Sequence, residues 1–340
     1  MTGRKTGAAG GLILTALAGC EGVQSALDPR GPVAADIATL WWVLLAGATL
    51  IYALTMGLLL YAVFRRHDRR IHLREGLLVV GGGLVFPTVT LIALLIYATD
   101  IGRRIVAGSD RPALQIEVTA HQWWWEVHYP GYEDDLPVTT ANELYLPLDV
   151  PVEVTLRSDD VIHSFWIPAL GGKLDAIPGR VSVLRFTAGE PGVYRGQCAE
   201  FCGAQHARMA FQVVAQSPLE FAGWRRARSL DAPSPPREGS PASNGRQAFI
   251  DHDCAECHRV RGAIAGSGEG DRLTGLRGPD LTHVAARSAL GARTLPYSRE
   301  NVARWIRHNQ QLKPGNRMPD FSELPEETAR SIADFLDTLQ

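Results

Sequence analysis

The sequence predicts a multidomain membrane protein made of a two-helix transmembrane hairpin, a β-sandwich and a small all-α domain. Two long segments near the N-terminus, 41–64 and 76–98, contain no charged residue. Short runs of alternating apolar and polar residues, separated by turn residues, then fill 113–217. Helical spacing returns near the C-terminus. The predicted parts are an export signal at 1–19, the hairpin at 35–105, the sandwich at 110–220, a linker at 228–243 and the all-α domain at 244–340.

Length, charge and cysteine usage bound the possible functions. A chain of 340 residues has room for two or three domains. Its net charge of -2 argues against a nucleic-acid partner, because such partners require a basic face. Four of the five cysteines form two close pairs and one stands alone. Close pairs in an exported protein can be disulfides, so the surroundings of each pair have to decide its role.

The N-terminus predicts a signal peptide of the lipoprotein type. Arg4 and Lys5 precede the apolar stretch 7–18, which is too short to span a bilayer. The next residues, Leu17-Ala18-Gly19-Cys20, resemble a bacterial lipobox, in which the cysteine is lipidated and becomes the new N-terminus. A plain signal peptide followed by an incidental cysteine is the alternative. Lipidation of Cys20 would anchor the outer side to membrane lipid.

The two uncharged segments predict membrane-spanning helices. Each exceeds the roughly 20 residues that cross about 30 Å of hydrocarbon as a helix. Buried helices of a soluble protein are the alternative. The connection between them is rich in arginine, which places it in the cytoplasm and the soluble domains on the periplasmic side of a bacterial inner membrane. Its arginines are Arg65, Arg66, Arg69, Arg70 and Arg74.

The alternating stretch predicts a β-sandwich or barrel. Leu114, Ile116 and Val118 alternate with polar neighbours, and glycine and proline separate this run from later ones. Near its end, Cys198, Cys202, His206 and Met209 fall within twelve residues, and His163 lies upstream.

These thiolate, imidazole and thioether groups form a soft donor set that suits copper. Two thiolates can bridge two copper ions, each with one histidine, while Met209 and the Glu200 carbonyl supply weak ligands. A Cys198–Cys202 disulfide and a Cys2His2 zinc site are the competing interpretations. Neither explains Met209, one of only four methionines, so the spacing favours copper and leaves all three open.

The C-terminal part predicts a covalent haem. A linker rich in Pro and Ser precedes Cys254, Cys257 and His258, which form C-x-x-C-H. This motif binds both haem vinyl groups through its thiols and the iron through its histidine. A thioredoxin-like redox pair is the alternative, but no βαβ pattern surrounds the motif.

The distal haem ligand is predicted to be Met318, the only methionine downstream of that motif. A Met/His pair is typical of a high-potential electron carrier, and it leaves no open position for a substrate. His283 and His308 are the alternatives. Helices predicted at 244–250 and 326–339 resemble the two terminal helices of a class I cytochrome c.

Three stretches resemble subunit II of the haem-copper cytochrome c oxidases, over about residues 35–215. The first is the aromatic run 122–125. The second is the segment 160–168, which continues into 173–180. The third, 198–209, fits the family pattern C-x-E-x-C-G-x-x-H-x-x-M at every fixed position. The resemblance implies that the sandwich is cupredoxin-like.

The resemblance also implies roles for individual residues. Trp123 would be the surface residue through which electrons enter, whereas Trp124 and Trp125 are interpreted as packing residues. The Glu200 carboxylate would help to bind Mg or Mn at the contact with subunit I. Glu75 is offset from the family's acidic position near a proton channel and is interpreted as a solvated loop residue. The implied dinuclear copper ligands are His163, Cys198, Glu200, Cys202, His206 and Met209.

The function implied is electron entry to a terminal oxidase. Electrons would pass from cytochrome c or another periplasmic donor to the haem, to the copper pair and then to subunit I, where oxygen is reduced to water and protons are translocated. No catalytic residue is expected in this chain, whose partners would be the other oxidase subunits. A free-standing membrane-tethered electron-transfer protein is the main alternative, and a copper delivery protein is a weaker one.

Overall fold

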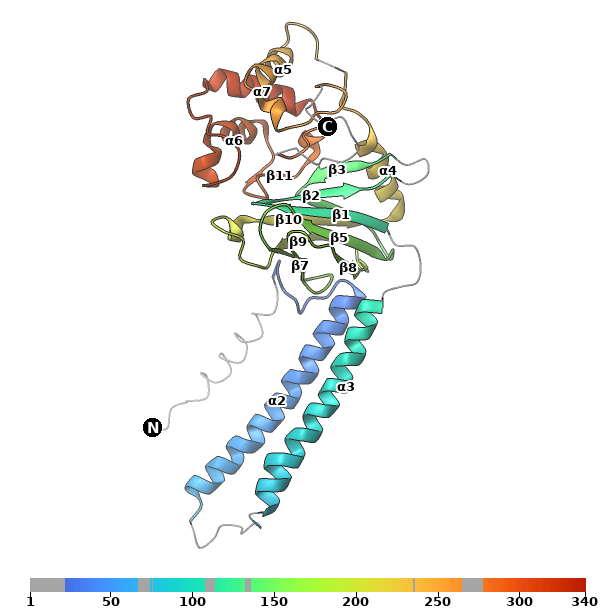
Figure 1. The fold of residues 1–340 in the computed structure, drawn as a ribbon, viewed down its shortest axis with the longest axis vertical. Helices are drawn as coiled ribbons and strands as arrows, with labels where there is room; N and C mark the ends of the chain where they lie inside the picture. The colour runs from blue at the N-terminus through green and yellow to red at the C-terminus, as the bar shows by residue number, and fades with distance from the viewer. Residues whose placement is uncertain are drawn as a thin grey trace, which may run out of the picture.

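The protein consists of three parts stacked end to end in a computed structural model (Figure 1). A helical hairpin lies at one end, a β-domain in the middle and a helical domain at the other end. The predicted signal peptide, Cys20 and Glu75 lie outside the described residues. The structure describes residues 22–66, 74, 76–107, 114–131, 136–234, 236–264 and 278–340.

The hairpin is formed by α2 (Pro32–Phe64) and by η3 (Leu77–Val85), which continues into α3 (Phe86–Ala107). Proline suits the first turn of α2, where its missing N–H would have no helical partner anyway. Both helices extend beyond the predicted 41–64 and 76–98 at the end next to the β-domain. They are long and apolar enough to cross a membrane, and side chains such as Leu50 are exposed along them.

The β-domain contains two five-stranded sheets, ordered β3-β2-β1-β5-β8 and β4-β10-β9-β6-β7. Within each sheet one neighbouring pair is parallel, β1 with β5 and β4 with β10, and the other pairs are antiparallel. The strands are β1 (Leu114–His121), β2 (Trp124–Tyr129), β3 (Val138–Ala141), β4 (Glu143–Pro147), β5 (Val152–Ser158), β6 (His163–Trp166), β7 (Leu174–Ala176), β8 (Ser182–Phe186), β9 (Gly192–Cys198) and β10 (Ala210–Gln216).

An aromatic cluster forms the part of the core next to the predicted copper ligands. Trp125, Phe165 and Phe211 are fully buried, with Phe165 and Phe211 stacked at 4.5 Å between ring centroids. Trp125 meets both rings edge-on, at 5.3 and 5.6 Å. Close packing of large flat rings leaves the strands around them little freedom to shift. The interpretation of Trp125 as a packing residue agrees with this position.

The helix α4 (Pro218–Ser229) follows β10, the last strand of the β-domain, and was not predicted from the sequence. Ser217 caps it: its hydroxyl accepts from the Glu220 N–H, and the Glu220 carboxylate accepts from the Ser217 N–H. Trp224 on this helix stacks on Tyr145 of β4 at 4.3 Å. The capping box and this stacking hold α4 against the β-domain.

The C-terminal domain is built around α5 (Pro241–Asp251) and α7 (Glu326–Asp337), which match the two predicted terminal helices. Their contact includes Phe249 and Phe335, both buried, with ring centroids 5.9 Å apart. The remaining elements are η5 (Cys254–Glu256), η6 (Val284–Ala286), β11 (Ala289–Leu290), β12 (Leu295–Pro296) and α6 (Arg299–Leu312).

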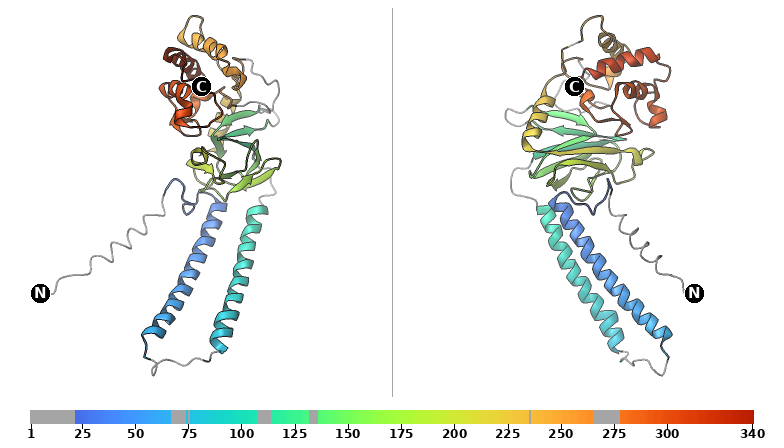
Figure 2. Two further views of the ribbon diagram at one scale, coloured as in Figure 1. Left: turned by 60° about the vertical axis from the view of Figure 1, so that its left-hand side comes forward. Right: turned by 180° about the vertical axis from the view of Figure 1, so that it is seen from behind.

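The C-terminal domain lies directly on the β-domain, as all three views show (Figure 2). The backbone N–H and hydroxyl of Ser288 both donate to Glu143 Oε1 at 2.7 Å across this contact. Arg261 also donates to carbonyls of Arg228, Ser229 and Leu230 at the start of the predicted linker. The first residues of the segment that connects the domains are therefore held against the C-terminal domain by hydrogen bonds from Arg261.

We expect Ser217→Ala to loosen α4, because the substitution leaves an N-terminal N–H of the helix without its acceptor. A lost N-cap costs about 1 kcal/mol, so amides of α4 should exchange with deuterium about fivefold faster. Hydrogen exchange of the full chain measures this. Ser217→Thr keeps a capping oxygen and is the control. Equal exchange in both variants would contradict the capping role.

Candidate metal centres

Strand register brings the predicted copper ligands together. β6 and β9 are antiparallel neighbours, with Phe165 opposite Cys198. His163 lies two residues before Phe165 and so points to the same face of the sheet as Cys198. The loop 198–209 leaves β9 at Cys198, makes a short helical turn η4 (His206–Arg208) and enters β10.

The side-chain donor atoms converge on the two cysteine sulfurs. Cys198 Sγ lies 3.7 Å from Cys202 Sγ and 3.9 Å from His163 Nδ1. Cys202 Sγ lies 3.7 Å from His206 Nδ1 and 3.8 Å from Met209 Sδ. All of these residues are buried except His206, which is half-buried. Each sulfur thus has one imidazole nitrogen beside it.

The two cysteines are free thiols in this arrangement. Their sulfurs are too far apart for a disulfide, whose S–S bond is about 2.05 Å. The contact between them lowers the pKa of Cys198 to about 3 and raises that of Cys202. Two like charges this close do not both ionise without a cation, so the pair is suited to metal that neutralises both thiolates. Sulfur, imidazole and thioether donors together fit copper better than zinc.

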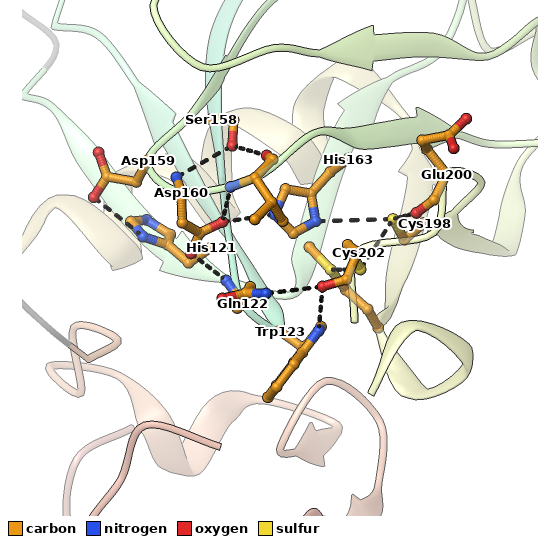
Figure 3. A network of polar contacts seen from close by, with 12 residues as sticks. His121, Gln122, Trp123, Ser158, Asp159, Asp160, His163, Cys198, Glu200 and Cys202 are labelled. Carbon is orange, nitrogen blue, oxygen red and sulfur yellow. Dashed lines mark hydrogen bonds and ion pairs between the residues drawn. The ribbon is translucent and has the colours of Figure 1, made fainter. Parts of the chain in front are cut away.

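His163 is oriented by Asp160, a residue that sequence reasoning did not single out. The His163 Nε2–H donates to Asp160 Oδ1 at 2.8 Å, which leaves Nδ1 directed at Cys198 (Figure 3). Burial acts to lower the pKa of His163, but its hydrogen bonds to Asp160 and Cys198 raise it overall. A carboxylate behind a histidine ligand fixes the tautomer and the ring. In the sequence, the position of Asp160 three residues before His163 could have indicated this role.

Glu200 places its two oxygen types in different surroundings. Its backbone carbonyl lies 3.1 Å from Cys198 Sγ, beside the pair of sulfurs. Its carboxylate belongs to an exposed side chain, and Figure 3 shows it directed away from the sulfurs.

Trp123 differs from its prediction as a surface residue, because only 8% of it is exposed. Its Nε1–H donates to the Cys202 carbonyl at 2.9 Å, so the indole is joined directly to the loop 198–209, called the copper loop below. The C-terminal domain covers it: Lys313 Nζ donates to the Trp123 carbonyl at 2.8 Å, and Gly315 lies against the ring. A pattern in one segment cannot show which distant segment will cover it.

The predicted haem-binding residues also lie together. Cys254 and Cys257 are free and partly buried in the turn that follows α5. The His258 Nδ1–H donates to the Pro279 carbonyl at 2.7 Å, which leaves Nε2 for a metal. Burial lowers the pKa of His258, so the imidazole is held neutral, as a ligand must be. Two free thiols beside an oriented neutral histidine fit covalent haem.

Gly278 packs against the face of that histidine. A Cβ added at this position would lie 2.6 Å from His258 Cε1, which is too close for any side chain. The glycine therefore lets backbone cover the imidazole.

Met318 lies on a loop held by two amide side chains. Its N–H donates to Asn316 Oδ1 at 2.9 Å, and its carbonyl accepts from Gln310 Nε2 at 2.7 Å. The first alternative ligand, His283, has both ring nitrogens engaged, with the carbonyls of Gln340 and Leu230. The second, His308, lines a groove between α6 and α7. These contacts favour Met318 over His283.

Two protein families match the chain. The family described as the periplasmic domain of cytochrome c oxidase subunit II matches residues 135–216, and the cytochrome c family matches residues 242–340. The matches contain the copper loop and the C-x-x-C-H motif respectively.

Two relatives are named as subunits of cytochrome c oxidase. Cytochrome c oxidase subunit 2 of Alkalihalophilus pseudofirmus is 32% identical, covering 95% of this chain and 94% of the relative. Cytochrome c oxidase subunit 2 of Bacillus subtilis is 30% identical, covering 76% and 70%. The crystal structure of the periplasmic domain of subunit II of cytochrome oxidase from Bradyrhizobium japonicum is 33% identical and superposes with a TM-score of 0.33, covering 35% of this chain and 96% of that one.

We expect Gly278→Ala to displace the His258 imidazole, because the new methyl group and the ring cannot occupy their present positions together. The visible spectrum of the haem should shift, and the reduced protein should bind carbon monoxide. Gly223→Ala is the matched control, since no atom lies within 4 Å of its added Cβ. A Gly278→Ala spectrum identical to that of the control would contradict the packing argument.

Proposed function

Because the chain belongs to the cytochrome c oxidase subunit II family, we propose that it is the electron-entry subunit of a terminal cytochrome c oxidase and carries two redox centres. The observation that supports this most strongly is the convergence of three further donor atoms, two imidazole nitrogens and one thioether sulfur, on the paired sulfurs of Cys198 and Cys202. The oxygen-reducing site belongs to another subunit, so enzyme activity is a property of the complex.

The proposed ligands of a dinuclear copper centre are the residues of that cluster. Cys198 and Cys202 would bridge the two ions, His163 and His206 would each bind one, and Met209 and the Glu200 carbonyl would be weak ligands. Cys254 and Cys257 would hold a haem c, with His258 and Met318 on the iron. When bound, the copper pair and the haem supply one-electron transfer between an external donor and the oxygen-reducing subunit.

The protein's own residues hold these groups in place. Asp160 orients His163, and the Trp123 indole ties down the Cys202 carbonyl. Burial of the sulfurs keeps water from the site and restrains their motion. Restraint of this kind suits electron transfer, because a ligand set that moves little on oxidation or reduction reorganises at low cost.

The surroundings of the chain are also part of the proposal. α2 and α3 would cross the bacterial inner membrane and leave the other domains in the periplasm, with lipidation of Cys20 as a further anchor. Subunit I and other oxidase subunits would contact the chain there. The exposed Glu200 carboxylate would contribute to a shared Mg or Mn site. Cytochrome c or another periplasmic protein would donate electrons to the haem, and Trp123 would accept them on the way to the copper pair.

A free-standing tethered electron carrier is the second candidate, and the described residues do not favour it. Such a carrier needs only one anchor, whereas this chain has a helical hairpin of membrane-spanning length. The relative from Alkalihalophilus pseudofirmus, named as an oxidase subunit, matches over nearly the whole chain.

We expect the purified full-length protein to contain two copper ions and one haem, and Cys198→Ser to abolish the low-energy copper absorption. Serine lacks the soft thiolate that bridges two ions. Metal analysis and visible spectroscopy measure both. The haem spectrum should be unchanged in this variant and is the internal control. One copper ion per chain in the wild type would contradict the bridged site.

We expect Met318→Ala to lower the haem reduction potential and to open the iron to carbon monoxide, because a Met/His pair raises the potential and closes the sixth position. Redox titration and carbon monoxide difference spectra measure these changes. Met56→Ala, on a membrane helix, is the matched control. An unaltered haem in Met318→Ala would move the distal ligand to another residue.

A further inference from the structure

Lys313 is a buried amine at the contact between the two soluble domains, and burial lowers its pKa to about 7. Only 3% of it is exposed, and in its protonated form the ammonium has three donors for three carbonyls. Lys313 Nζ donates to Trp123 O at 2.8 Å, to Gly291 O at 3.0 Å and to Arg208 O at 3.1 Å. Among the described residues, no carboxylate pairs with it.

The three carbonyls come from separate segments that the ammonium joins. Trp123 lies in the turn between β1 and β2, and its indole holds the Cys202 carbonyl. Arg208 lies in the copper loop, directly before Met209. Gly291 lies in the C-terminal domain, between β11 and β12. A flexible side chain with three converging acceptors is held in one geometry, so Lys313 fixes these segments relative to one another.

Neighbouring contacts repeat the same docking. Gln205 Nε2 donates to the Pro314 carbonyl at 2.8 Å, and the Arg208 side chain donates to the Leu312 carbonyl. Gly315, with φ of +78°, brings backbone over the indole: a Cβ there would lie 3.7 Å from Trp123 Cη2. The segment 312–315 thus packs against the copper loop and the neighbouring Trp123.

The docked segment is also joined to the proposed haem ligand. Asn316 Nδ2 donates to the Lys313 carbonyl at 2.8 Å, and Asn316 Oδ1 accepts from the Met318 N–H at 2.9 Å. Beside this turn, Arg317 pairs with Asp160 at 3.0 Å, and Asp160 holds His163. Short hydrogen-bonded links therefore run from Lys313 to both proposed metal sites.

We propose that Lys313 is the positioning residue that holds the C-terminal domain closed over Trp123, so that electrons reach this indole from the chain's own haem domain and not from a free carrier. This rests on the proposed function. An external donor would then reduce the exposed part of the haem domain. Each transfer moves one electron, which the haem loses and the copper pair gains.

The first test is chemical modification of Trp123 in the full-length protein, by hydroxyl-radical footprinting read by mass spectrometry. Lys313→Met removes the ammonium, leaves its acceptors without a donor and should open the contact. Modification of Trp123 should rise about tenfold, since three buried hydrogen bonds are lost. Arg330→Met is the control, because it removes one cation from an exposed ion pair on α7 of the same domain.

The second test is the rate of electron transfer from the reduced haem to the copper pair in the assembled oxidase, after rapid photoreduction. It should fall about tenfold in Lys313→Met, with the haem spectrum and copper EPR signal unchanged. Both readouts at the level of Arg330→Met would overturn the proposal. A second variant, Lys313→Gln, keeps some donors and should lie between wild type and Lys313→Met.

Two further outcomes are decisive. Loss of the haem spectrum in both Lys313 variants would overturn the proposal, because it would assign Lys313 to the folding of its own domain. A wild-type protein without copper would overturn the proposed function. Footprinting of Trp123 needs no metal, so it tests the docking role of Lys313 separately.

Discussion

Two cysteine sulfurs held 3.7 Å apart in a buried site are the constraint on which the β-domain depends. Without metal, one sulfur holds the proton that the other gives up, as the opposite pKa shifts of Cys198 and Cys202 indicate. Such a pair is costly to bury unless cations neutralise it. The surrounding strands must therefore keep the donors converged. The stacked rings of Phe165 and Phe211, with Trp125 against both, supply that rigidity directly beside the ligand-bearing strands.

The second arrangement that matters for function is the contact between the soluble domains. Electron transfer falls steeply with separation, so a tethered haem domain is useful only when it is docked in a suitable position. The tether itself cannot specify that position, because it constrains distance and not orientation. Buried polar contacts can, since each leaves an unsatisfied group when the domains are displaced. Lys313 and Gln205 each contribute such a contact, and Ser288 adds hydrogen bonds to the buried carboxylate of Glu143.

The same contact changes the meaning of the aromatic run 122–125. Trp123 is adjacent to the copper loop through its hydrogen bond to the Cys202 carbonyl, as expected for an electron-accepting residue. Its outer side, however, faces the C-terminal domain and not solvent. Fusion of a carrier to its acceptor can convert a surface for transient encounters into an internal contact. The occupancy of that internal contact is then set by the effective concentration of the tethered domain rather than by encounters with a free carrier.

The sequence by itself determined the elements whose signals are local. Hydrophobic length indicated the hairpin, alternation indicated the strands, and motif spacing identified the copper loop and the C-x-x-C-H residues. These signals work because each one lies within a single continuous stretch of the chain. The helix α4 lies outside the elements predicted from hydrophobic patterns, although Ser217 and Glu220 form a capping-box signature at its start.

Only the tertiary structure decided which distant residues meet. Asp160 behind His163, Gly278 against His258 and Lys313 under Trp123 depend on how separate segments pack. A lysine 190 positions away leaves no trace in the sequence around its acceptor, because a backbone carbonyl is present at every residue. For this reason the prediction that Trp123 lies at the surface was wrong. The exposure of a side chain depends on the whole fold, whereas its chemical properties depend on the residue type.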